Sequence, residues 1–357
     1  MSIFSKQIHV NTSPGYEVII SHDVLKNCGE WLHYNLLSPC KIAVITDSNV
    51  SPLYLKTVTD SLTNWNFTVS TYIFQAGENS KNFDTLSNIV EFLAAEHLTR
   101  SDCVAALGGG VVGDMAGFAA ACYLRGIRYV QMPTTMLAAV DSSVGGKTAI
   151  DLKAGKNLAG AFLQPSAVLC DLACLRSLPQ SVLLGGTAEA VKTGVLCDET
   201  LFALFENGSL SNDPGEVIAR CVAYKAGVVE RDEREQGERK LLNLGHTVGH
   251  AIEKCSNYTT PHGQAVAAGL AIIARSAERL NWTLEPVADR ITACLTELDL
   301  PVNTLYSAEA LADAALSDKK RFGGEITLVI PEKIGLCTLK KIPVSKLLPV
   351  IKAGLGR

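Results

Sequence analysis

The sequence lacks several features that mark whole classes of protein. Its Lys and Arg residues form no dense run, and the formal net charge is only −4. Neither nucleic-acid binding nor binding to a membrane surface therefore has support from composition. The first residues have no apolar signal core, and the chain has no internal repeat or low-complexity tract. We expect a soluble protein of the cytoplasm.

Cysteine is present without a redox or zinc pattern. The eleven cysteines are scattered, and the closest pair, Cys170 and Cys174, lacks the C-x-x-C spacing. This favours reduced, mostly buried thiols over a disulfide framework. One long apolar stretch, 104–124, contains Asp114 and five glycines. That composition is typical of a buried strand, turn and helix rather than of a membrane span.

The alternation of strand and helix patterns predicts the fold class of the first half. A length of 357 residues favours two domains, each with a sizeable core. The β-α-β rhythm indicates a parallel sheet covered by helices. The predicted strands are 17–21, 41–46, 68–74, 103–107, 128–132 and 167–171, and the predicted helices are 52–64, 83–97 and a glycine-rich one that ends at 123.

The second half is predicted to be mainly helical. Leu178 and Pro179 form a plausible hinge. The predicted helices are 182–196, 214–229, 241–254, 265–281, 286–298 and 309–318, with one short strand at 325–330. We therefore predict an α/β domain at 1–178 and a mainly α-helical domain at 179–357.

A glycine-rich turn follows one predicted strand and opens a helix. Gly108, Gly110 and Gly113 have the G-x-G-x-x-G spacing, which favours a pyrophosphate at a helix N-terminus. The alternative interpretation, a tight turn that binds no ligand, is kept because this turn does not follow the first strand. No acid stands about 20 residues further on; the acid at a strand end is Asp47, earlier in the chain. A dinucleotide site here would depart from the standard Rossmann arrangement.

A second glycine loop carries lysines. Residues 141–148 resemble the end of a P-loop, but Asp141 stands where that motif requires glycine. A phosphate-binding NTPase is therefore disfavoured. Lys147, Lys153 and Lys156 follow one another closely, and this clustering favours an anionic ligand over solvated surface charges.

The densest chemistry lies between Arg239 and His262, which hold three of the seven histidines. Read as one helix, 239–253 places a cation, an amide, two imidazoles and a carboxylate within roughly 80° of arc. These residues are Arg239, Asn243, His246, His250 and Glu253. One narrow stripe of this composition indicates a metal site or an acid–base site.

Metal ligation needs donors from more than one element. His246 and His250 have the i, i+4 spacing of zincins, but Thr247 stands where the general-base Glu of that motif belongs. His262 and Glu189 are the further candidates. Two His and one carboxylate with an open position are a common catalytic zinc set. For any single histidine, an ordinary buried and hydrogen-bonded ring remains the alternative.

These segments together resemble the 3-dehydroquinate synthase family of sugar phosphate cyclases. The matching segments are 109–114 (GGVVGD), 133–150 (PTTMLAAVDSSVGGKTAI), 155–157 (GKN), 187–194 (TAEAVKTG), 241–253 (LLNLGHTVGHAIE) and 262–263 (HG). They cover most of the chain in the order of the family. The resemblance implies a dehydroquinate synthase-like fold, in which a Rossmann-like NAD-binding α/β domain joins a helical metal-binding domain, usually in a homodimer.

The resemblance also implies which residues serve each ligand. One divalent metal ion, zinc or cobalt, would be held by Glu189, His246 and His262. The positions that match NAD contacts are Asp47, Glu78, Lys81, Gly110, Val111, Val112, Gly113, Asp114, Thr134, Thr135, Lys147, Lys156, Cys174, Leu175, Arg176 and Ser177. The positions that match catalytic or substrate-pocket residues are Arg125, Asp141, Asn157, Lys192, Lys225, Arg239, Asn243 and His250. Arg125 matches an arginine that reaches the phosphate pocket across a dimer interface, and Lys319 or Lys320 a further phosphate contact.

The implied activity is that of a carbon–oxygen lyase of the shikimate pathway. In this family 3-deoxy-arabino-heptulosonate 7-phosphate becomes 3-dehydroquinate and phosphate. A ring hydroxyl is transiently oxidised with NAD while the metal polarises its oxygen; phosphate then leaves, the ketone is reduced again, and an aldol step closes the ring. The acidic sugar phosphate explains the several cations, and His250 is the candidate for moving protons.

Three alternatives are weighed against this one. A cyclase for a neutral sugar phosphate would not need Lys225, Arg239 and Asn243, and a metal-dependent polyol dehydrogenase would release NADH without so many anion-binding groups. A non-catalytic binding protein would require a lost ligand, and none is lost. Gln264 and Thr193 depart from the acid and the tyrosine that the family often has there, which bears on hydrogen bonds near His262 rather than on the ligands.

Overall fold

The computed structural model describes residues 6–206, 213–316 and 324–356. The chain forms two compact units, which are described separately. Unit 1 comprises 1–178 and 225–234, and unit 2 comprises 179–224 and 235–357. The helix α7 (Pro214–Arg231) contributes its last turns to unit 1. The single boundary predicted after 178 instead places these turns in the second domain.

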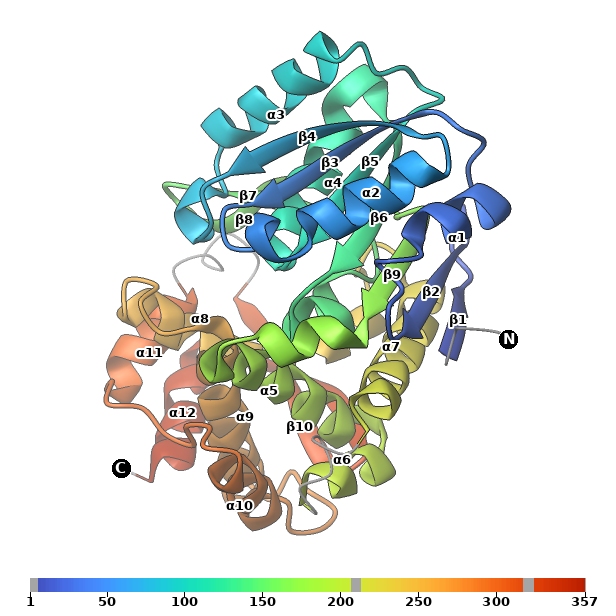
Figure 1. The fold of residues 1–357 in the computed structure, drawn as a ribbon. Coiled ribbons are helices and arrows are strands. Elements are labelled where there is room, and N and C mark those ends of the chain that lie inside the picture. Colours follow the sequence, from blue (N-terminus) through green and yellow to red (C-terminus); the bar gives the residue numbers. More distant parts are fainter. Residues whose placement is uncertain (1–5, 207–212, 317–323, 357) are drawn as a thin grey trace. The chain divides into compact units, whose positions relative to one another are not determined.

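Unit 1 is built on a seven-stranded sheet with the order β1-β2-β9-β6-β5-β3-β4 (Figure 1). All neighbouring strands are parallel except β1 and β2, which are antiparallel. The strands are β1 (Lys6–Val10), β2 (Tyr16–Ser21), β3 (Lys41–Asp47), β4 (Thr68–Phe74), β5 (Cys103–Gly108), β6 (Arg128–Pro133) and β9 (Ala167–Asp171). The predicted parallel sheet is confirmed, and β1 is an addition that the sequence pattern did not indicate.

Helices cover both faces of this sheet. On one face Val44 packs in a cluster with residues of α1 (Cys28–Asn35) and α2 (Lys56–Asn64). On the other face Ile45 packs with residues of α3 (Phe83–Ala95) and α4 (Gly110–Cys122). Successive residues of a strand point to opposite faces, so an apolar run such as 42–45 is buried on both sides. A short antiparallel hairpin, β7 (Lys147–Leu152) with β8 (Gly155–Phe162), follows β6.

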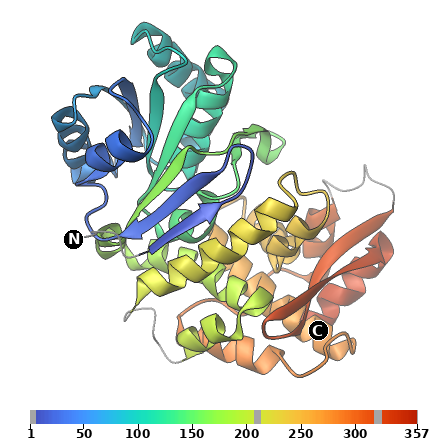
Figure 2. The ribbon, with the colours of Figure 1, turned by 90° about the vertical axis from the view of Figure 1, so that its right-hand side faces the viewer.

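Unit 2 is mainly helical, as predicted, and packs around α9 (His262–Arg279), most of whose residues are buried. An antiparallel hairpin, β10 (Glu325–Lys333) with β11 (Leu336–Pro343), adds the long red ribbon of Figure 2. The other α-helices that lie wholly within the described part of unit 2 are α5 (Gln180–Cys197), α6 (Glu199–Glu206), α8 (His246–Cys255), α10 (Ala288–Glu297), α11 (Ala308–Leu316) and α12 (Leu347–Leu355).

One prediction in unit 2 is wrong: residues 239–253 do not form one helix. A 3₁₀ helix (Glu238–Asn243) comes first, and α8 begins only at His246. Between them Gly245 has a φ of 76°, a conformation that favours glycine. The turn is also crowded, because a Cβ at Gly269 of α9 would lie 2.2 Å from the Gly245 oxygen. The close approach of α9 therefore requires the chain to turn where the periodicity alone predicted a continuous helix.

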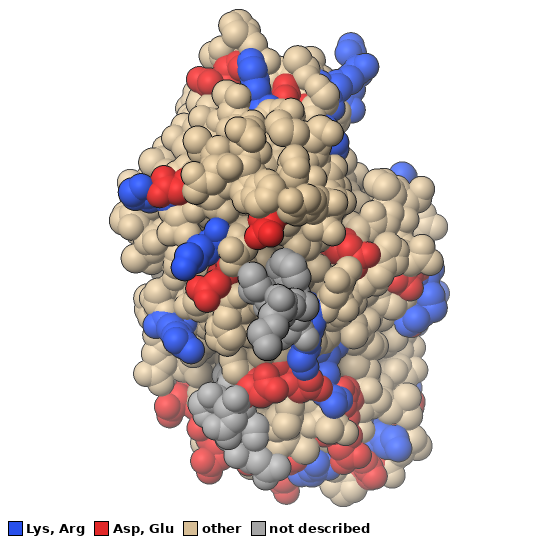
Figure 3. Space-filling model, turned by 45° about the vertical axis from the view of Figure 1, so that its right-hand side comes forward, with Lys and Arg blue, Asp and Glu red and all other residues tan. Residues whose placement is uncertain are grey.

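The remaining observations concern charge and cysteine. All eleven cysteines are free thiols. On the face drawn in Figure 3, cationic and anionic side chains are intermixed, as the small net charge predicts. Within 6–206, 213–316 and 324–356, no helix combines the length and the apolar character needed to cross a membrane.

Candidate active site

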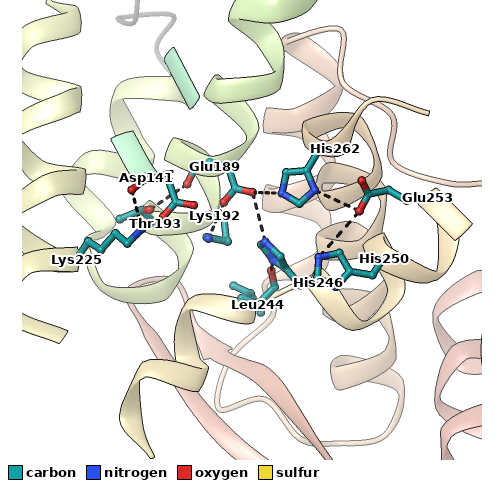
Figure 4. A network of polar contacts seen from close by, with 10 residues as sticks. All are labelled: Asp141, Glu189, Lys192, Thr193, Lys225, Leu244, His246, His250, Glu253 and His262. Atoms are coloured by element: carbon teal, nitrogen blue, oxygen red, sulfur yellow. Dashed lines mark hydrogen bonds and ion pairs between the residues drawn. The ribbon is translucent and has the colours of Figure 1, made fainter. Parts of the chain in front are cut away.

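Three side chains of unit 2 converge from three helices (Figure 4). Glu189 lies in α5, while His246 and His262 are the first residues of α8 and α9. Glu189 Oε1 lies 3.2 Å from His262 Nε2 and 3.5 Å from His246 Nε2. One donor atom from each residue falls within 4.8 Å of the other two. This is the ligand set that the resemblance implied, brought together by the fold.

Glycines permit this convergence. Gly263 follows His262 directly, and a Cβ there would lie 2.1 Å from the Gly185 oxygen. Gly185 precedes Glu189 by one helical turn of α5. The first turn of α9 can therefore approach the backbone of α5 closely only because position 263 has no side chain.

Glu189 is a buried carboxylate with a defined electrostatic environment. Burial alone would raise its pKa, but the Lys192 ammonium, 2.6 Å from Oε2, and the imidazoles of His246 and His262 hold it well below the usual range. Oε2 pairs with the Lys192 ammonium, whereas the contacts described for Oε1 are those with the two imidazole nitrogens. A buried carboxylate oxygen that faces two imidazole nitrogens fits a divalent cation shared between these three residues.

Both imidazoles point the same nitrogen at Glu189. His246 Nδ1 lies 3.0 Å from the Leu244 carbonyl oxygen, and His262 Nδ1 lies 3.3 Å from Glu253 Oε2. Each ring therefore has an acceptor behind it and its Nε2 in front, the arrangement found for histidine ligands of metals. Burial lowers the pKa of His246 to about 3, which keeps that ring neutral. Burial would also lower the pKa of His262, but hydrogen bonds to Glu189 and Glu253 raise it to about 10.

A second donor set overlaps the first. His250, Glu253 and His262 also place donor atoms within 4.8 Å of one another. His250 Nε2 lies 4.0 Å from Glu253 Oε2, and the His250 side chain is 60% exposed. His262 is common to both sets, so the geometry alone leaves two places where a metal ion could bind.

The glycine turn of unit 1 lies at the N-terminus of α4. Gly109 is the N-cap residue and, as a glycine, supplies no side-chain cap. A Cβ at Gly109 would lie 3.0 Å from the Thr135 side chain, and the Thr134 amide donates to the Gly108 carbonyl at 2.9 Å. The Thr134 hydroxyl is buried and has no hydrogen-bond partner among the described residues. A helix N-terminus beside a spare hydroxyl suits the phosphates of a dinucleotide.

A buried ion pair lies beside this turn. Lys81 Nζ is 2.6 Å from Asp114 Oδ2 and donates to Asn157 Oδ1 at 2.5 Å. Burial would lower the pKa of Lys81, but the carboxylates of Asp114 and Glu78 outweigh it and raise that pKa. Lys156 Nζ lies 3.7 Å from Glu78 Oε1. The structure thus brings together four predicted NAD-binding residues, Glu78, Lys81, Asp114 and Lys156. Asn157, which was predicted to contact the substrate, lies with them.

Comparison with known proteins identifies the family. The model of the 3-dehydroquinate synthase N-terminal domain matches residues 71–184, and that of the 3-dehydroquinate synthase C-terminal domain matches residues 186–321. The chain belongs to the 3-dehydroquinate synthase family. A 3-dehydroquinate synthase from Clostridium kluyveri is 40% identical over 344 residues, which are 94% of this chain and 96% of the relative. One from Streptococcus thermophilus is 40% identical over 345 residues, 95% of this chain and 97% of the relative.

Solved structures confirm the dehydroquinate synthase-like fold. A 2-deoxy-scyllo-inosose synthase complexed with carbaglucose-6-phosphate, NAD⁺ and Co²⁺ has a TM-score of 0.84 and 25% identity, and the match covers 98% of this chain and 99% of that one. A 2-epi-5-epi-valiolone synthase from Streptomyces hygroscopicus has a TM-score of 0.86 and 24% identity, covering 96% of each chain. A glycerol dehydrogenase from Schizosaccharomyces pombe has a TM-score of 0.66 and 18% identity, covering 95% and 88%.

The other predicted substrate residues of this 3-dehydroquinate synthase family member fall into two groups. In unit 1, Lys225 Nζ donates to Asp141 Oδ1 at 2.7 Å and to the Asp141 carbonyl at 2.6 Å. In unit 2, Arg239 is buried in the 3₁₀ helix before α8, and Asn243 Nδ2 donates to Glu235 Oε1 at 2.7 Å. Lys192 completes the second group through its ion pair with Glu189.

The remaining predicted NAD contacts occupy strand and turn ends of unit 1. Asp47 ends β3, and its Oδ1 accepts hydrogen bonds at 2.9 Å from two amides of the following turn. Residues 174–177 lie in a 3₁₀ helix (Leu172–Ser177), where the Ser177 hydroxyl is hydrogen-bonded to the Tyr54 hydroxyl. Burial raises the pKa of Cys174 to about 12. Lys147 is exposed at the start of β7.

Of the residues predicted to bind phosphate at a dimer interface or beside it, the structure describes Arg125 but not Lys319 or Lys320. Arg125 is exposed, and it stands in a turn in which Leu124, Arg125 and Gly126 have successive φ values of 50°, 65° and 116°. Such a run of left-handed residues is strained for side chains other than glycine. Lys319 and Lys320 lie outside the described residues.

Sequence reasoning missed the groups that stand behind the ligands. Glu253 was placed on the polar stripe without a function, and the carbonyl of Leu244 carries no sequence signal at all. Glu253 follows His250 by three residues, a spacing that pairs it with His250 rather than with His262. Only the approach of α9 to α8 reveals that its nearer imidazole is His262.

Proposed function

We propose that this protein is a 3-dehydroquinate synthase that converts 3-deoxy-arabino-heptulosonate 7-phosphate into 3-dehydroquinate and phosphate. The observation that carries the proposal is the Glu189, His246 and His262 cluster, in a chain 40% identical to relatives of that name over nearly its whole length. The reaction uses NAD and one divalent ion, zinc or cobalt. A related cyclase whose structure is solved in complex with NAD⁺ and Co²⁺ supports this choice.

We assign the ligands to the two units as follows. Glu189, His246 and His262 hold the metal ion, and the residues at the N-terminus of α4, together with Lys81, Asp114 and Thr134, bind NAD. Residues 1–178 thus form the NAD-binding domain and 179–357 the metal- and substrate-binding domain, except for 225–234, which belong to unit 1. When bound, NAD supplies a hydride acceptor and donor, and the metal ion supplies a Lewis acid.

The buried cations support an acidic substrate. Lys192, Lys225 and Arg239 are all buried, and Lys192 pairs with Glu189 while Lys225 pairs with Asp141, so a substrate anion would share these two cations with a carboxylate. The proposed substrate carries both a carboxylate and a phosphate, which charge-assisted hydrogen bonds from such groups bind strongly. A neutral sugar phosphate has only one of these anions. We propose substrate contacts from all three cations and from Asp141, Asn157, Asn243 and His250.

His250 is proposed to move protons during the reaction. It projects from the same helix as the metal-binding His246, and the ring centroids of the two lie 5.2 Å apart. Its side chain is 60% exposed, so the imidazole can exchange protons with substrate or solvent. We further propose a homodimer in the cytoplasm, in which the exposed Arg125 of the partner subunit completes the phosphate pocket.

The test is a metal-replete turnover assay with purified protein. We expect equal amounts of phosphate and 3-dehydroquinate from 3-deoxy-arabino-heptulosonate 7-phosphate with catalytic NAD and zinc or cobalt, without net NADH. Absence of phosphate release under these conditions contradicts the proposal. NADH that accumulates with a simple polyol would identify a dehydrogenase, and turnover of a neutral sugar phosphate would identify a different cyclase.

Metal content tests the ligands separately. Glu189→Ala and His246→Ala are expected to lose the bound metal ion, because each removes one of three donors. Glu309→Ala, which removes an exposed carboxylate of α11 paired with Lys352, is the matched control and should retain it. An unchanged metal stoichiometry in Glu189→Ala would refute the ligand assignment.

A further inference from the structure

His262 lies between two carboxylates that compete for it. Its Nε2 is 3.2 Å from Glu189 Oε1, and its Nδ1 is 3.3 Å from Glu253 Oε2. An imidazole that binds a metal ion uses the lone pair of one nitrogen and can carry a proton only on the other. The nitrogen that carries the proton therefore decides which of the two overlapping donor sets can use this ring. With the proton on Nδ1, His262 can complete only the set with Glu189 and His246.

Glu253 is built into unit 2 so that its carboxylate faces this ring. The side chain is 3% exposed, and the residue lies in the last turn of α8. Its backbone carbonyl accepts hydrogen bonds from the Ser256 hydroxyl at 2.8 Å and from the Tyr258 amide at 2.7 Å, which fixes the end of the helix. A buried carboxylate requires donors, and an Nδ1–H of His262 satisfies that requirement.

His246 shows the same arrangement with a different acceptor. Its Nδ1 faces the carbonyl oxygen of Leu244 at 3.0 Å, and a carbonyl oxygen can only accept a hydrogen bond. The proton of His246 is thereby held on Nδ1, and Nε2 is directed at Glu189. The backbone sets the tautomer of one ligand, while the tautomer of the other depends on a side chain.

We propose that Glu253 is a positioning residue that selects Nε2 of His262 as the metal-binding nitrogen. It thereby directs the ion to Glu189, His246 and His262, and away from His250, Glu253 and His262. The inference rests on the proposed function of the first set. It adds that the second set is not a metal site, because Glu253 is engaged as an acceptor, and that His250 is thereby left for the substrate.

The test compares two substitutions of Glu253 with a control. Glu253→Gln keeps an oxygen that can accept from Nδ1–H, whereas Glu253→Ala removes it. Glu278→Ala is the control, because that carboxylate accepts from the Ala288 amide at 2.9 Å at the start of α10 and belongs to neither donor set. Zinc affinity is measured by competition with a chromophoric chelator, and the ring nitrogens of His262 by long-range ¹H–¹⁵N NMR of the zinc-loaded protein.

We expect zinc on Nε2 and a proton on Nδ1 in the unmodified protein. Glu253→Ala should weaken zinc binding about 10- to 100-fold, the usual effect of losing such a partner, and should mix the two nitrogens. Glu253→Gln should restore the Nδ1–H signal and most of the affinity, within about fivefold. Glu278→Ala should lower thermal stability alone.

Two results would overturn the inference. One is zinc on Nδ1 of His262 in the unmodified protein, a measurement that needs no variant. The other is a Glu253→Ala protein with unchanged zinc affinity and unchanged ring signals. Failure of the proposed metal site is distinguishable from either, because Glu189→Ala would then bind zinc as tightly as the unmodified protein does.

Discussion

Substituting Gly263 by alanine tests the packing that brings His262 to Glu189. The added Cβ would lie 2.1 Å from the Gly185 carbonyl oxygen and 2.4 Å from the Gly185 Cα. Ordinary contact requires about 3.5 Å, and these neighbours are backbone atoms that cannot rotate away. The first turn of α9 must therefore retreat from α5 by roughly 1 Å.

The retreat affects stability and metal binding together. Overpacking of this kind costs about 1–3 kcal/mol in unfolding free energy. His262 moves with the first turn, and metal–ligand distances tolerate only about 0.2 Å. The shift exceeds that tolerance, so we expect zinc affinity to fall at least about tenfold, as it does when ligand orientation is disturbed.

The facing glycine supplies a matched control. A Cβ at Gly185 would meet nothing within 4 Å, and the residue lies inside α5. Gly185→Ala should therefore leave zinc binding unchanged and stabilise the helix by up to about 1 kcal/mol. Urea unfolding of the metal-free proteins and chelator competition measure both effects. A Gly263→Ala protein as stable as the original, with the same zinc affinity, would refute the packing argument.

Two further predictions concern unit 1. Burial would raise the pKa of Asp102, but hydrogen bonds from the Thr99 and Lys41 amides lower it. Because the pKa is lower in the folded state, the ionised carboxylate stabilises the fold at neutral pH, and this stabilisation is lost as pH falls through that pKa. Asp102→Asn should thus lower the free energy of unfolding by about 1–3 kcal/mol at pH 7. The difference between the two proteins in urea unfolding should shrink below about pH 4. A difference that does not change with pH would contradict this reasoning. Thr134→Val removes a buried hydroxyl without a described partner, so it should leave folding stability within about 1 kcal/mol yet weaken NAD binding by about fivefold or more in fluorescence titration; equal NAD affinity would exclude this hydroxyl as a contact.

The parts of the fold that the sequence predicts well are those with a local cause. β3 and β9 are short apolar runs, and β3 is rich in β-branched residues; a strand buried on both faces needs nothing more. The β7–β8 hairpin was missed because its glycines and lysines resemble a loop, although a Cβ at Gly160 would lie 2.0 Å from the Thr148 oxygen of the paired strand. That glycine is required by strand pairing across a turn, which a single segment does not reveal.

In the site, too, local patterns were visible in the sequence, whereas contacts between distant segments were not. The i, i+4 spacing of His246 and His250 is visible in the sequence and favours a shared metal ion, but in the structure His250 instead lies beside Glu253. The periodicity of 239–253 continues through Gly245, so a pattern of residue types cannot show where the helix starts. The left-handed φ of Gly245 and the approach of Gly269 depend on α9. Residue types and spacing indicated four candidate ligands, and the family resemblance selected Glu189, His246 and His262 from them.

The charges around the proposed metal site give a physical reason for two carboxylates. His246 and His262 begin their helices, so Glu189 faces two helix N-termini, which favour an anion and oppose a cation. With neutral imidazoles, Glu189, Glu253 and Lys192 together carry one net negative charge. A divalent ion reverses this to one net positive charge, which suits an anionic substrate oxygen. Without Glu253 the same ion would enter a site with no net negative charge, against two helix ends.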